Sequence, residues 1–417
     1  MAQTEFFDAL ETRSPEQRER EHMSALAAQV AHAQQHSTAF AEILGGVEAA
    51  GVSSRQALAQ LPVTRKSDLL ERQKAQRARD PFGGFSALLR GPGMSRVYAS
   101  PGPIYEPEGA TRNYWRAGRC LYAAGFRAGE LVHNAFSYHM TPGAFILESG
   151  AHAVGCSVFP AGTGQTEQQL QAIHELKPEA YTGTPSFLRI LVERAQADGV
   201  DISSLRKAVV GGEALPPSLR DWFAERGVSV YQSYATADLG LVAYETSARE
   251  GLVIDEGVIV EIVRPGTGEP VPDGEVGELV VTTLNPAYPL IRFGTGDLSA
   301  ILPGACPTGR TGPRIKGWMG RADQTTKVRG MFVHPAQVAD IARRFPQVKK
   351  ARLVVSGEMA NDQMCLRVEA SDDHNGLQKQ IEAAVREVTK LRAQVELVQP
   401  GTLPNDGKVI EDARSYQ

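Results

Sequence analysis

The chain of 417 residues has few cysteines, no strong charge bias and no long apolar run. No C-x-x-C pair occurs among Cys120, Cys156, Cys306 and Cys365, so neither a disulfide framework nor a zinc ribbon is indicated. A formal net charge of −4 without a basic run gives no electrostatic case for nucleic acid. No segment approaches the roughly 18 uninterrupted apolar residues of a membrane helix. We therefore expect neither a nucleic-acid partner nor a membrane partner.

The remaining composition is that of a globular protein, with 42% hydrophobic and 22% charged residues. The first twenty residues contain early acidic residues and no apolar core, which argues against a signal peptide and predicts a cytoplasmic location. The length predicts two or three domains. The oligomeric state stays open, with a homodimer among the alternatives.

Periodicity predicts a chain of two parts. Residues 131–162 and 164–195 each alternate apolar strands with a helical pattern, which predicts βαβ units and a parallel sheet. Residues 251–284 read as short strands with turns, and beyond Gly330 a briefer alternation predicts a small α+β unit. The predicted fold is α/β with a β-rich subdomain over residues 1–320, followed by an α+β domain over 321–417.

The stretch 291–330 lies between these two parts and carries charged residues suited to a nucleotide. An apolar, strand-like run leads to Asp297, and a turn-rich segment then leads to Arg321. A carboxylate can accept hydrogen bonds from two vicinal hydroxyls, and a guanidinium can bind phosphate or ribose oxygens in a forked manner. This pair predicts a polyhydroxylated, phosphorylated ligand.

Three motifs in a fixed order carry a family resemblance. T-G-D-L begins at residue 295, G-R-x-D at 320 and L-P-x-x-G-K at 403. This order resembles the adenylate-forming acyl- and aryl-CoA ligases, most of all the phenylacetate-CoA ligase branch, over nearly the whole chain. The resemblance implies a carboxylic acid substrate, ATP, Mg²⁺ and coenzyme A. It also implies that residues 321–417 form a mobile lid on an adenylate-forming, acid-binding domain.

The resemblance assigns roles around this stretch. Lys408 would be the catalytic cation delivered by the lid, and Asp323 or its neighbour Gln324 would be the hinge. Arg329 and Gly330 would line the passage for coenzyme A. The remaining nucleotide-binding residues expected here are Asp297, Arg314 and Arg321.

The phosphate-binding loop of the family corresponds to 96–109, where this chain departs from the pattern. Ser100 and Gly102 are the surviving loop residues, in a segment predicted to run from a strand through a Gly/Pro loop to a helix beginning at Ala110. Proline removes backbone donors and glutamate adds negative charge; the segment contains Pro101, Pro103, Pro107, Glu106 and Glu108. A rigid loop that has lost phosphate binding and a redesigned one are equally open.

The second altered motif lies at 234–238, where the family has Y-G-x-Ser/Thr-Glu. Tyr234 and Thr236 are expected at the nucleotide, and Ala235 at the acid. Asp238 takes the place of the glutamate that helps to hold Mg²⁺, and its side chain is one methylene shorter. Because Mg²⁺ keeps several waters, we expect Asp238 to act through a water or a moved backbone.

The acid pocket and the adenine site are expected at two further segments. Phe136, Tyr138 and His139 lie where the family lines its acid pocket, although a lone histidine among aromatics is more often a satisfied core residue. The turn at Gly212 and Glu213 would pass over the adenine, since glycine permits close backbone approach. An ordinary strand-to-helix connection explains that turn equally well.

The preferred functional prediction is an ATP-dependent ligase that joins a carboxylic acid, of aromatic type, to coenzyme A and releases AMP and pyrophosphate. A second hypothesis keeps the adenylation step but transfers the acyl group to a carrier-protein thiol or an amine. A third hypothesis is a non-catalytic relative that binds an acyl group or a nucleotide. The altered motifs favour the third, and the retention of Asp297, Arg321 and Lys408 opposes it.

Overall fold

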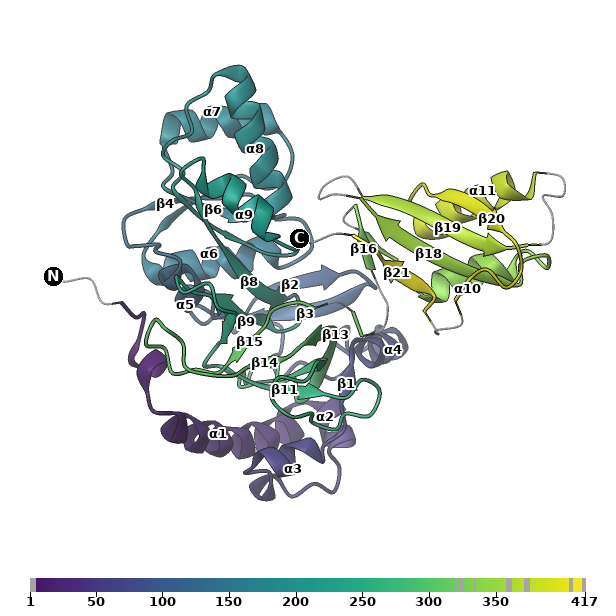
Figure 1. Cartoon of the computed structure of the whole chain (residues 1–417). Coiled ribbons are helices and arrows are strands. Elements are labelled where there is room, and N and C mark those ends of the chain that lie inside the picture. Colours follow the sequence, from purple (N-terminus) through teal and green to yellow (C-terminus); the bar gives the residue numbers. More distant parts are fainter. Residues whose placement is uncertain are drawn as a thin grey trace. The chain divides into compact units, whose positions relative to one another are not determined.

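The computed structural model of the protein (Figure 1) describes residues 5–319, 321–322, 326–329, 331–333, 335–357, 362–370, 376–404 and 408–414. The chain divides into two compact units, residues 1–319 and 320–417. This division lies one residue before the boundary expected from the sequence.

A mixed sheet of nine strands forms the centre of unit 1, in the order β14-β15-β10-β9-β8-β7-β6-β4-β5. The five strands from β8 to β5 are parallel, and the remaining neighbours pair in antiparallel fashion. Their bounds are β4 Leu131–Asn134, β5 Ser157–Pro160, β6 Ala180–Gly183, β7 Lys207–Val210, β8 Ser229–Thr236, β9 Gly240–Glu245, β10 Leu252–Ile254, β14 Ile301–Leu302 and β15 Arg314–Ile315.

Helices connect the parallel strands, as the two predicted βαβ repeats require. Thr184 caps α8 by accepting from the amide of Phe187, and Pro185 occupies the first turn, where its missing N–H costs nothing. Gly155 ends α6 in the left-handed conformation. The helices of this part are α5 Gly118–Ala123, α6 Gly143–Val154, α7 Thr166–Leu176, α8 Pro185–Asp198 and α9 Pro217–Ala224. The predicted parallel sheet is confirmed.

The strand order reverses between two neighbouring strands of this sheet, β4 and β6. From β4 the chain leads to β5 on one side, and from β6 it proceeds through β7 and β8 on the other. The neighbouring strands β4 and β6 therefore continue in opposite directions. Ligands of open α/β sheets bind at such a switch point, outside the carboxyl ends of the strands. We therefore expect a ligand site at the segments that follow β4, β6, β7 and β8.

A second sheet of four strands, in the order β1-β13-β12-β11, is the predicted β-rich part of unit 1. It shares a hydrophobic core with the N-terminal helix α1, whose start Ser14 caps by accepting from the amide of Gln17. The strands are β1 Thr64–Arg65, β11 Val258–Val263, β12 Gly277–Thr283 and β13 Phe293–Ser299. The N-terminal helices are η1 Ala9–Thr12, α1 Pro15–His36, α2 Thr38–Ile43, η2 Ala49–Gly51, α3 Arg55–Ala59 and α4 Lys66–Gln76.

The segment 96–109 differs from its prediction. It forms an antiparallel ribbon of β2, Met94–Ser100, and β3, Ile104–Gly109, with a turn only three residues long. Pro107 is tolerated in β3 because this ribbon has no third strand among the described residues. The helix expected from Ala110 begins at Gly118, after Asn113 and Arg116 adopt positive φ angles that helices do not contain.

Unit 2 contains a four-stranded sheet, β20-β19-β18-β21, and a hairpin of β16 and β17. The last strand, β21, pairs in parallel with β18. The elements are β16 Thr326–Val328, β17 Met331–Val333, α10 Pro335–Arg343, β18 Lys350–Ser356, β19 Gln363–Glu369, α11 Leu377–Thr389, β20 Gln394–Val398 and β21 Ile410–Asp412. The predicted combination of an α/β unit and a small α+β unit is confirmed.

In the described part of the chain, no helix has both the length and the apolar character that are needed to cross a bilayer.

Candidate active site

Asp297 lies within β13 and both of its carboxylate oxygens accept hydrogen bonds. The hydroxyl of Tyr234 donates to Oδ2 at 2.6 Å, and the indole Nε1 of Trp318 donates to Oδ1 at 3.1 Å. Tyr234 belongs to β8, so this carboxylate joins the four-stranded and nine-stranded sheets. The sequence pattern predicted Asp297 and Tyr234 but not Trp318, whose signal was an aromatic residue just before the G-R-x-D motif. The arrangement fixes the direction of a half-buried carboxylate at the carboxyl end of β8.

A second polar group joins three segments that are far apart in the sequence. Lys66, the first residue of α4, places its ammonium 2.9 Å from Asp238 Oδ2 and 3.5 Å from the hydroxyl of Ser100. Asp238 follows β8 and is 4% exposed. Its second oxygen, Oδ1, is buried and has no hydrogen-bond partner among the described residues. This carboxylate is therefore balanced by one cation and keeps one acceptor unfilled.

Glu106 completes this second group from within β3. It is fully buried and accepts hydrogen bonds from the hydroxyl and, at 3.3 Å, the amide of Ser100. Burial, followed by the nearby charge of Asp238, raises the pKa of Glu106 to about 8. Glu108 pairs instead with Arg96 at 2.8 Å. The expectation that these two glutamates place negative charge in a phosphate-binding loop is therefore wrong, because both lie in the ribbon and are bonded within the fold.

Phe136, in the segment that follows β4, lies against two glycines of the loop after β7. A Cβ atom added to Gly211 or Gly212 would lie 3.9 Å from the ring of Phe136, so the ring packs against a bare backbone. Gly212 also has φ +75°, a conformation that favours glycine. Glu213, next along the chain, accepts from the amide of Ser186 at 3.3 Å and links the loop after β7 to the start of α8. The predicted turn thus borders the predicted pocket.

Tyr138 is held by the end of β4 and by α6. Its hydroxyl accepts from Nδ2 of Asn134 at 2.8 Å and donates to Glu148 at 2.6 Å. Burial and this hydrogen bond to Glu148 raise the pKa of Tyr138 above its ordinary value. His139 is exposed at the start of the loop that continues toward α6. The predicted aromatic segment therefore contains one internally bonded tyrosine and one solvent-exposed histidine beside Phe136.

The hydroxyl of Thr236 serves the turn after β8. It accepts from the amide of Leu239 at 3.1 Å and so stabilises the turn that carries Asp238. Ala235 is half-buried in β8 next to it. The two residues lie between Tyr234 and Asp238, so one segment of five residues supplies both polar groups described above.

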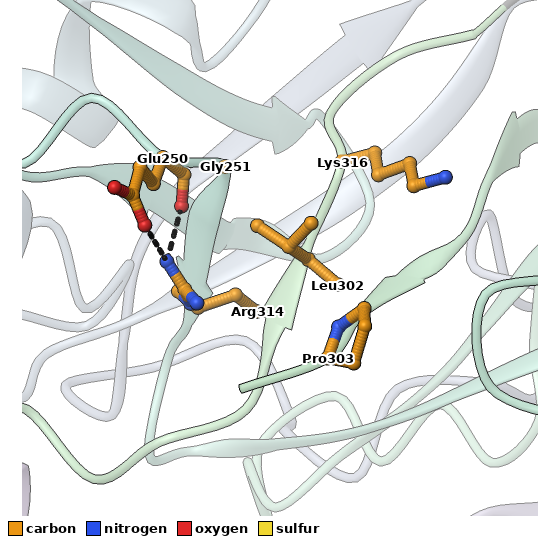
Figure 2. Close-up of a pocket in the computed structure, with 6 residues that line it drawn as sticks. All are labelled: Glu250, Gly251, Leu302, Pro303, Arg314 and Lys316. Atoms are coloured by element: carbon orange, nitrogen blue, oxygen red, sulfur yellow. Dashed lines mark hydrogen bonds and ion pairs between the residues drawn. The ribbon is translucent and has the colours of Figure 1, made fainter. Parts of the chain in front are cut away.

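Arg314 forms its hydrogen bonds with residues that belong to neither of these two polar groups. Figure 2 shows its guanidinium against Glu250, where Nη1 donates to the carbonyl at 2.8 Å and to the carboxylate at 3.3 Å. Nη2 donates to the carbonyls of Gly304 and Ala305 at 3.2 and 3.0 Å. These bonds hold β15 to its surrounding loops. The hollow of about 530 Å³ drawn there is lined by Glu250, Gly251, Leu302, Pro303, Arg314 and Lys316.

The predicted residues of unit 2 are described only in part. Lys408 is exposed two residues before β21, and Arg321 is half-buried. The amide of Arg329 donates to the carboxylate of Asp362 at 2.9 Å, and its guanidinium donates to the carbonyl of the same residue at 2.9 Å. The predicted hinge residue Asp323 and the predicted passage residue Gly330 lie outside the described residues.

The similarity to characterised enzymes extends along most of the chain. The phenylacetate-coenzyme A ligase of Thermus thermophilus is 32% identical over 395 residues, which cover 86% of this chain and 87% of that protein. The chain belongs to the adenylate-forming enzymes, in their phenylacetate-CoA ligase branch. The AMP-binding enzyme family matches residues 116–287, and the AMP-binding enzyme C-terminal domain matches residues 330–412.

One further relative agrees with this membership, and one solved structure has the same fold. The phenylacetate-coenzyme A ligase of Escherichia coli K12 is 30% identical and covers 84% of each chain. The crystal structure of a 2-hydroxyisobutyryl-CoA ligase, 24% identical, has the same fold with a TM-score of 0.83 over 100% of this chain and 94% of that chain. The present chain is thus an acid–thiol ligase, and CoA ligases of its family use ATP, Mg²⁺ and coenzyme A. The prediction that the chain is an enzyme is confirmed.

Proposed function

We propose that this ligase activates an aromatic carboxylic acid with ATP and transfers the acyl group to coenzyme A. The observation that supports this most directly is the position of Asp297, held by Tyr234 and Trp318 at the carboxyl end of β8. A carboxylate whose direction is fixed in this way is suited to accept hydrogen bonds from both hydroxyls of a ribose. Its partner Tyr234 lies on the strand that leads into the turn carrying Asp238, so nucleotide and Mg²⁺ would be bound at one edge of the sheet.

The reaction takes place in two steps. A carboxylate oxygen of the acid attacks the α-phosphorus of ATP, which forms an acyl-adenylate and releases pyrophosphate. The thiolate of coenzyme A then attacks the acyl carbon, which forms the thioester and releases AMP. Negative charge gathers around the α-phosphorus in the first step, so a positive charge placed there lowers the barrier. We assign this role to the ammonium of Lys408.

The nucleotide and the metal would be held as follows. Asp297 and Arg321 would bind the ribose and phosphate oxygens, and the turn at Gly212 and Glu213 would pass over the adenine. Asp238 would hold Mg²⁺, and its unfilled Oδ1 supports this because a hard cation prefers oxygen ligands. In unit 2, Asp323 would be the hinge and Arg329 with Gly330 would border the path of coenzyme A.

The acid would bind next to Phe136, beside the switch point. The ring of Phe136 and the bare backbone of Gly211 and Gly212 present an apolar surface, which suits an aryl group better than a charged one. The relatives from Thermus thermophilus and Escherichia coli are named for phenylacetate, which supports an arylacetic acid as the first substrate to test.

The test is acid-dependent release of pyrophosphate by the purified protein. Phenylacetate, benzoate and hexanoate are each supplied with ATP and Mg²⁺, with and without coenzyme A, and Lys408→Ala is the control. We expect release with the aryl acids, acceleration by coenzyme A and loss of release in the variant. Pyrophosphate release that coenzyme A does not accelerate would favour transfer to a carrier-protein thiol or an amine. Release with hexanoate alone would contradict the aromatic acid.

The cytoplasmic location and the homodimer stay predictions of the sequence. Fractionation of cells that express the protein and light scattering of the purified chain would test them.

A further inference from the structure

The turn of the β2–β3 ribbon offers little to a triphosphate. Its three residues include Pro101 and Pro103, neither of which has an N–H group, so Gly102 supplies the one backbone donor of the turn. A phosphate-binding loop works through several backbone N–H groups that point at the same anion. In this chain the contacts that such N–H groups make with phosphate must come from side chains.

Helix α4 lies along this turn and presents such side chains. Gln73 donates to the carbonyl of Tyr105 at 2.9 Å and accepts from its amide at 2.8 Å, which fixes the helix against β3. A Cβ atom on Gly102 would lie 3.2 Å from Cδ1 of Leu70, so the turn itself contacts the helix. Lys66 begins this helix and reaches the hydroxyl of Ser100, the residue immediately before the turn. A lysine of α4 is therefore a cation placed next to the turn.

The ribbon also contacts the loop that follows β4 at the switch point. The amide of Ala99 donates to the carbonyl of Met140 at 2.8 Å, in the loop between β4 and α6 that contains Phe136. Asp238, the partner of Lys66, follows Tyr234 by four residues on the other side. Lys66 thus lies among segments that border the proposed nucleotide site.

We propose that Lys66 is a phosphate-binding residue of this enzyme. When the nucleotide binds, the ammonium of Lys66 leaves Asp238 and contacts the β- and γ-phosphates of ATP. The inference rests on the proposed function, in which Asp238 holds Mg²⁺. Before the exchange, Lys66 pairs with Asp238 and Mg²⁺ pairs with the triphosphate. After the exchange, Asp238 pairs with Mg²⁺ and Lys66 pairs with the triphosphate. The number of ion pairs is therefore two in both states. The side chain of Lys66 is 40% exposed whereas that of Asp238 is 2% exposed, so the lysine can move while the carboxylate stays. The arriving cation also fills the buried Oδ1 of Asp238.

The test compares nucleotides that differ in the β- and γ-phosphates. Dissociation constants for Mg–ATP and for AMP are measured by calorimetry with the full chain and with Lys66→Met, Lys66→Arg and Lys74→Met. Lys74 is an exposed lysine on the same helix and serves as the matched control. We expect Lys66→Met to weaken Mg–ATP about 10- to 100-fold, the range of one hydrogen bond between charged groups. AMP binding stays within twofold, because AMP lacks both phosphates, and Lys66→Arg retains most of the affinity.

Two outcomes would overturn the proposal. One is unchanged Mg–ATP affinity in Lys66→Met, and the other is equal loss of Mg–ATP and AMP, which would make Lys66 a support of the fold. If Lys66→Met does not fold because Asp238 is left unpaired, the double variant with Asp238→Asn removes both charges. It is compared with Asp238→Asn alone, and equal Mg–ATP affinity of the two would also refute the proposal.

The half-reactions separate this proposal from the proposed function. Thioester formation from a synthetic acyl-adenylate and coenzyme A should proceed within twofold of the unchanged enzyme in Lys66→Met, because pyrophosphate has already left. A parent enzyme that binds Mg–ATP but releases no pyrophosphate with any acid would refute the proposed function and leave the nucleotide comparison valid. A parent enzyme that does not bind Mg–ATP would refute both.

Discussion

Glu106 provides a sharp test of the buried polar group because its charge can be removed without changing its shape. Glu106→Gln keeps the length of the side chain and an oxygen that accepts from the amide of Ser100, and its new NH₂ group can donate to the hydroxyl. The residue is fully buried, so solvent does not screen the change. If Glu106 faced the nucleotide, the variant would act on ATP binding, but its burial in the ribbon predicts an effect on stability.

The sign of this effect follows from the two pKa values. The pKa of this carboxyl is 4.5 in the unfolded chain and about 8 in the folded protein, where burial and Asp238 disfavour its charge. Between these pH values the folded state holds a proton that the unfolded chain has released, so stability falls as the pH rises through this window. The full penalty, present above pH 8, is at most about 5 kcal/mol. Glu106→Gln should therefore match the parent near pH 5 and exceed its free energy of unfolding by several kcal/mol at pH 9.

Urea unfolding followed by tryptophan fluorescence measures this difference. Trp115, Trp222 and Trp318 all belong to unit 1, so the signal reports on the unit that contains Glu106. The pH dependence of groups that do not interact with Glu106 cancels when the variant is compared with the parent at each pH. Glu71→Gln, an exposed change on α4, is the control and should alter stability little at either pH. A gain in Glu106→Gln that is the same at pH 5 and pH 9 would refute the reasoning.

Three further changes test other parts of the site and fold. Arg292→Met should destabilise unit 1 by about 3–5 kcal/mol, because the buried Glu261, whose carboxylate lies 3.0 Å from the guanidinium, loses its partner. Urea unfolding measures this difference, and a loss below about 1 kcal/mol would contradict the prediction. Tyr234→Phe should raise the dissociation constant for AMP about 3- to 10-fold, since one hydrogen bond that directs Asp297 is removed; calorimetry that finds no change would count against Asp297 as the ribose ligand. Lys408→Ala should lower acid-dependent pyrophosphate release at least about 100-fold and leave AMP binding within twofold; equal loss of both would show that the lysine supports the fold.

Local signals were sufficient for the parallel sheet. Apolar runs of four or five residues, separated by helical periods, predicted β4 to β7, and three of these strands, β4, β6 and β7, are almost entirely buried. Ser14 and Thr184, each followed by proline, are the side-chain caps of two helices. Motif order singled out Asp297, which the structure places beside Tyr234 of β8. All of these features depend on neighbours in the sequence.

Features that depend on distant partners were missed. Lys66 and Asp238 are 172 residues apart, and no periodicity indicates that they are in contact. The three residues of β21 are a strand only because β18 supplies a parallel partner. In the β2–β3 ribbon, three prolines suggested a loop, but Pro107 can pair with Val97 because the edge strand needs no donor there. Sequence composition predicts a loop at such a position, but a place at the edge of a sheet allows the residue to lie in a strand.

The polar group around Asp238 bears on whether the altered motifs still leave a working nucleotide site. A buried carboxylate oxygen without a partner costs about 1–3 kcal/mol, and the ion pair with the 40% exposed Lys66 offsets only part of the cost of burying Asp238. Asp238 with its unfilled Oδ1 therefore gives the fold no evident advantage. A cation that binds there removes the cost, and the lysine it displaces is then beside a turn that lacks backbone donors. The prolines of the ribbon thus change which groups hold the phosphates, from backbone N–H to the side chain of Lys66, and the requirement for a cation at Asp238 is what connects the two altered motifs.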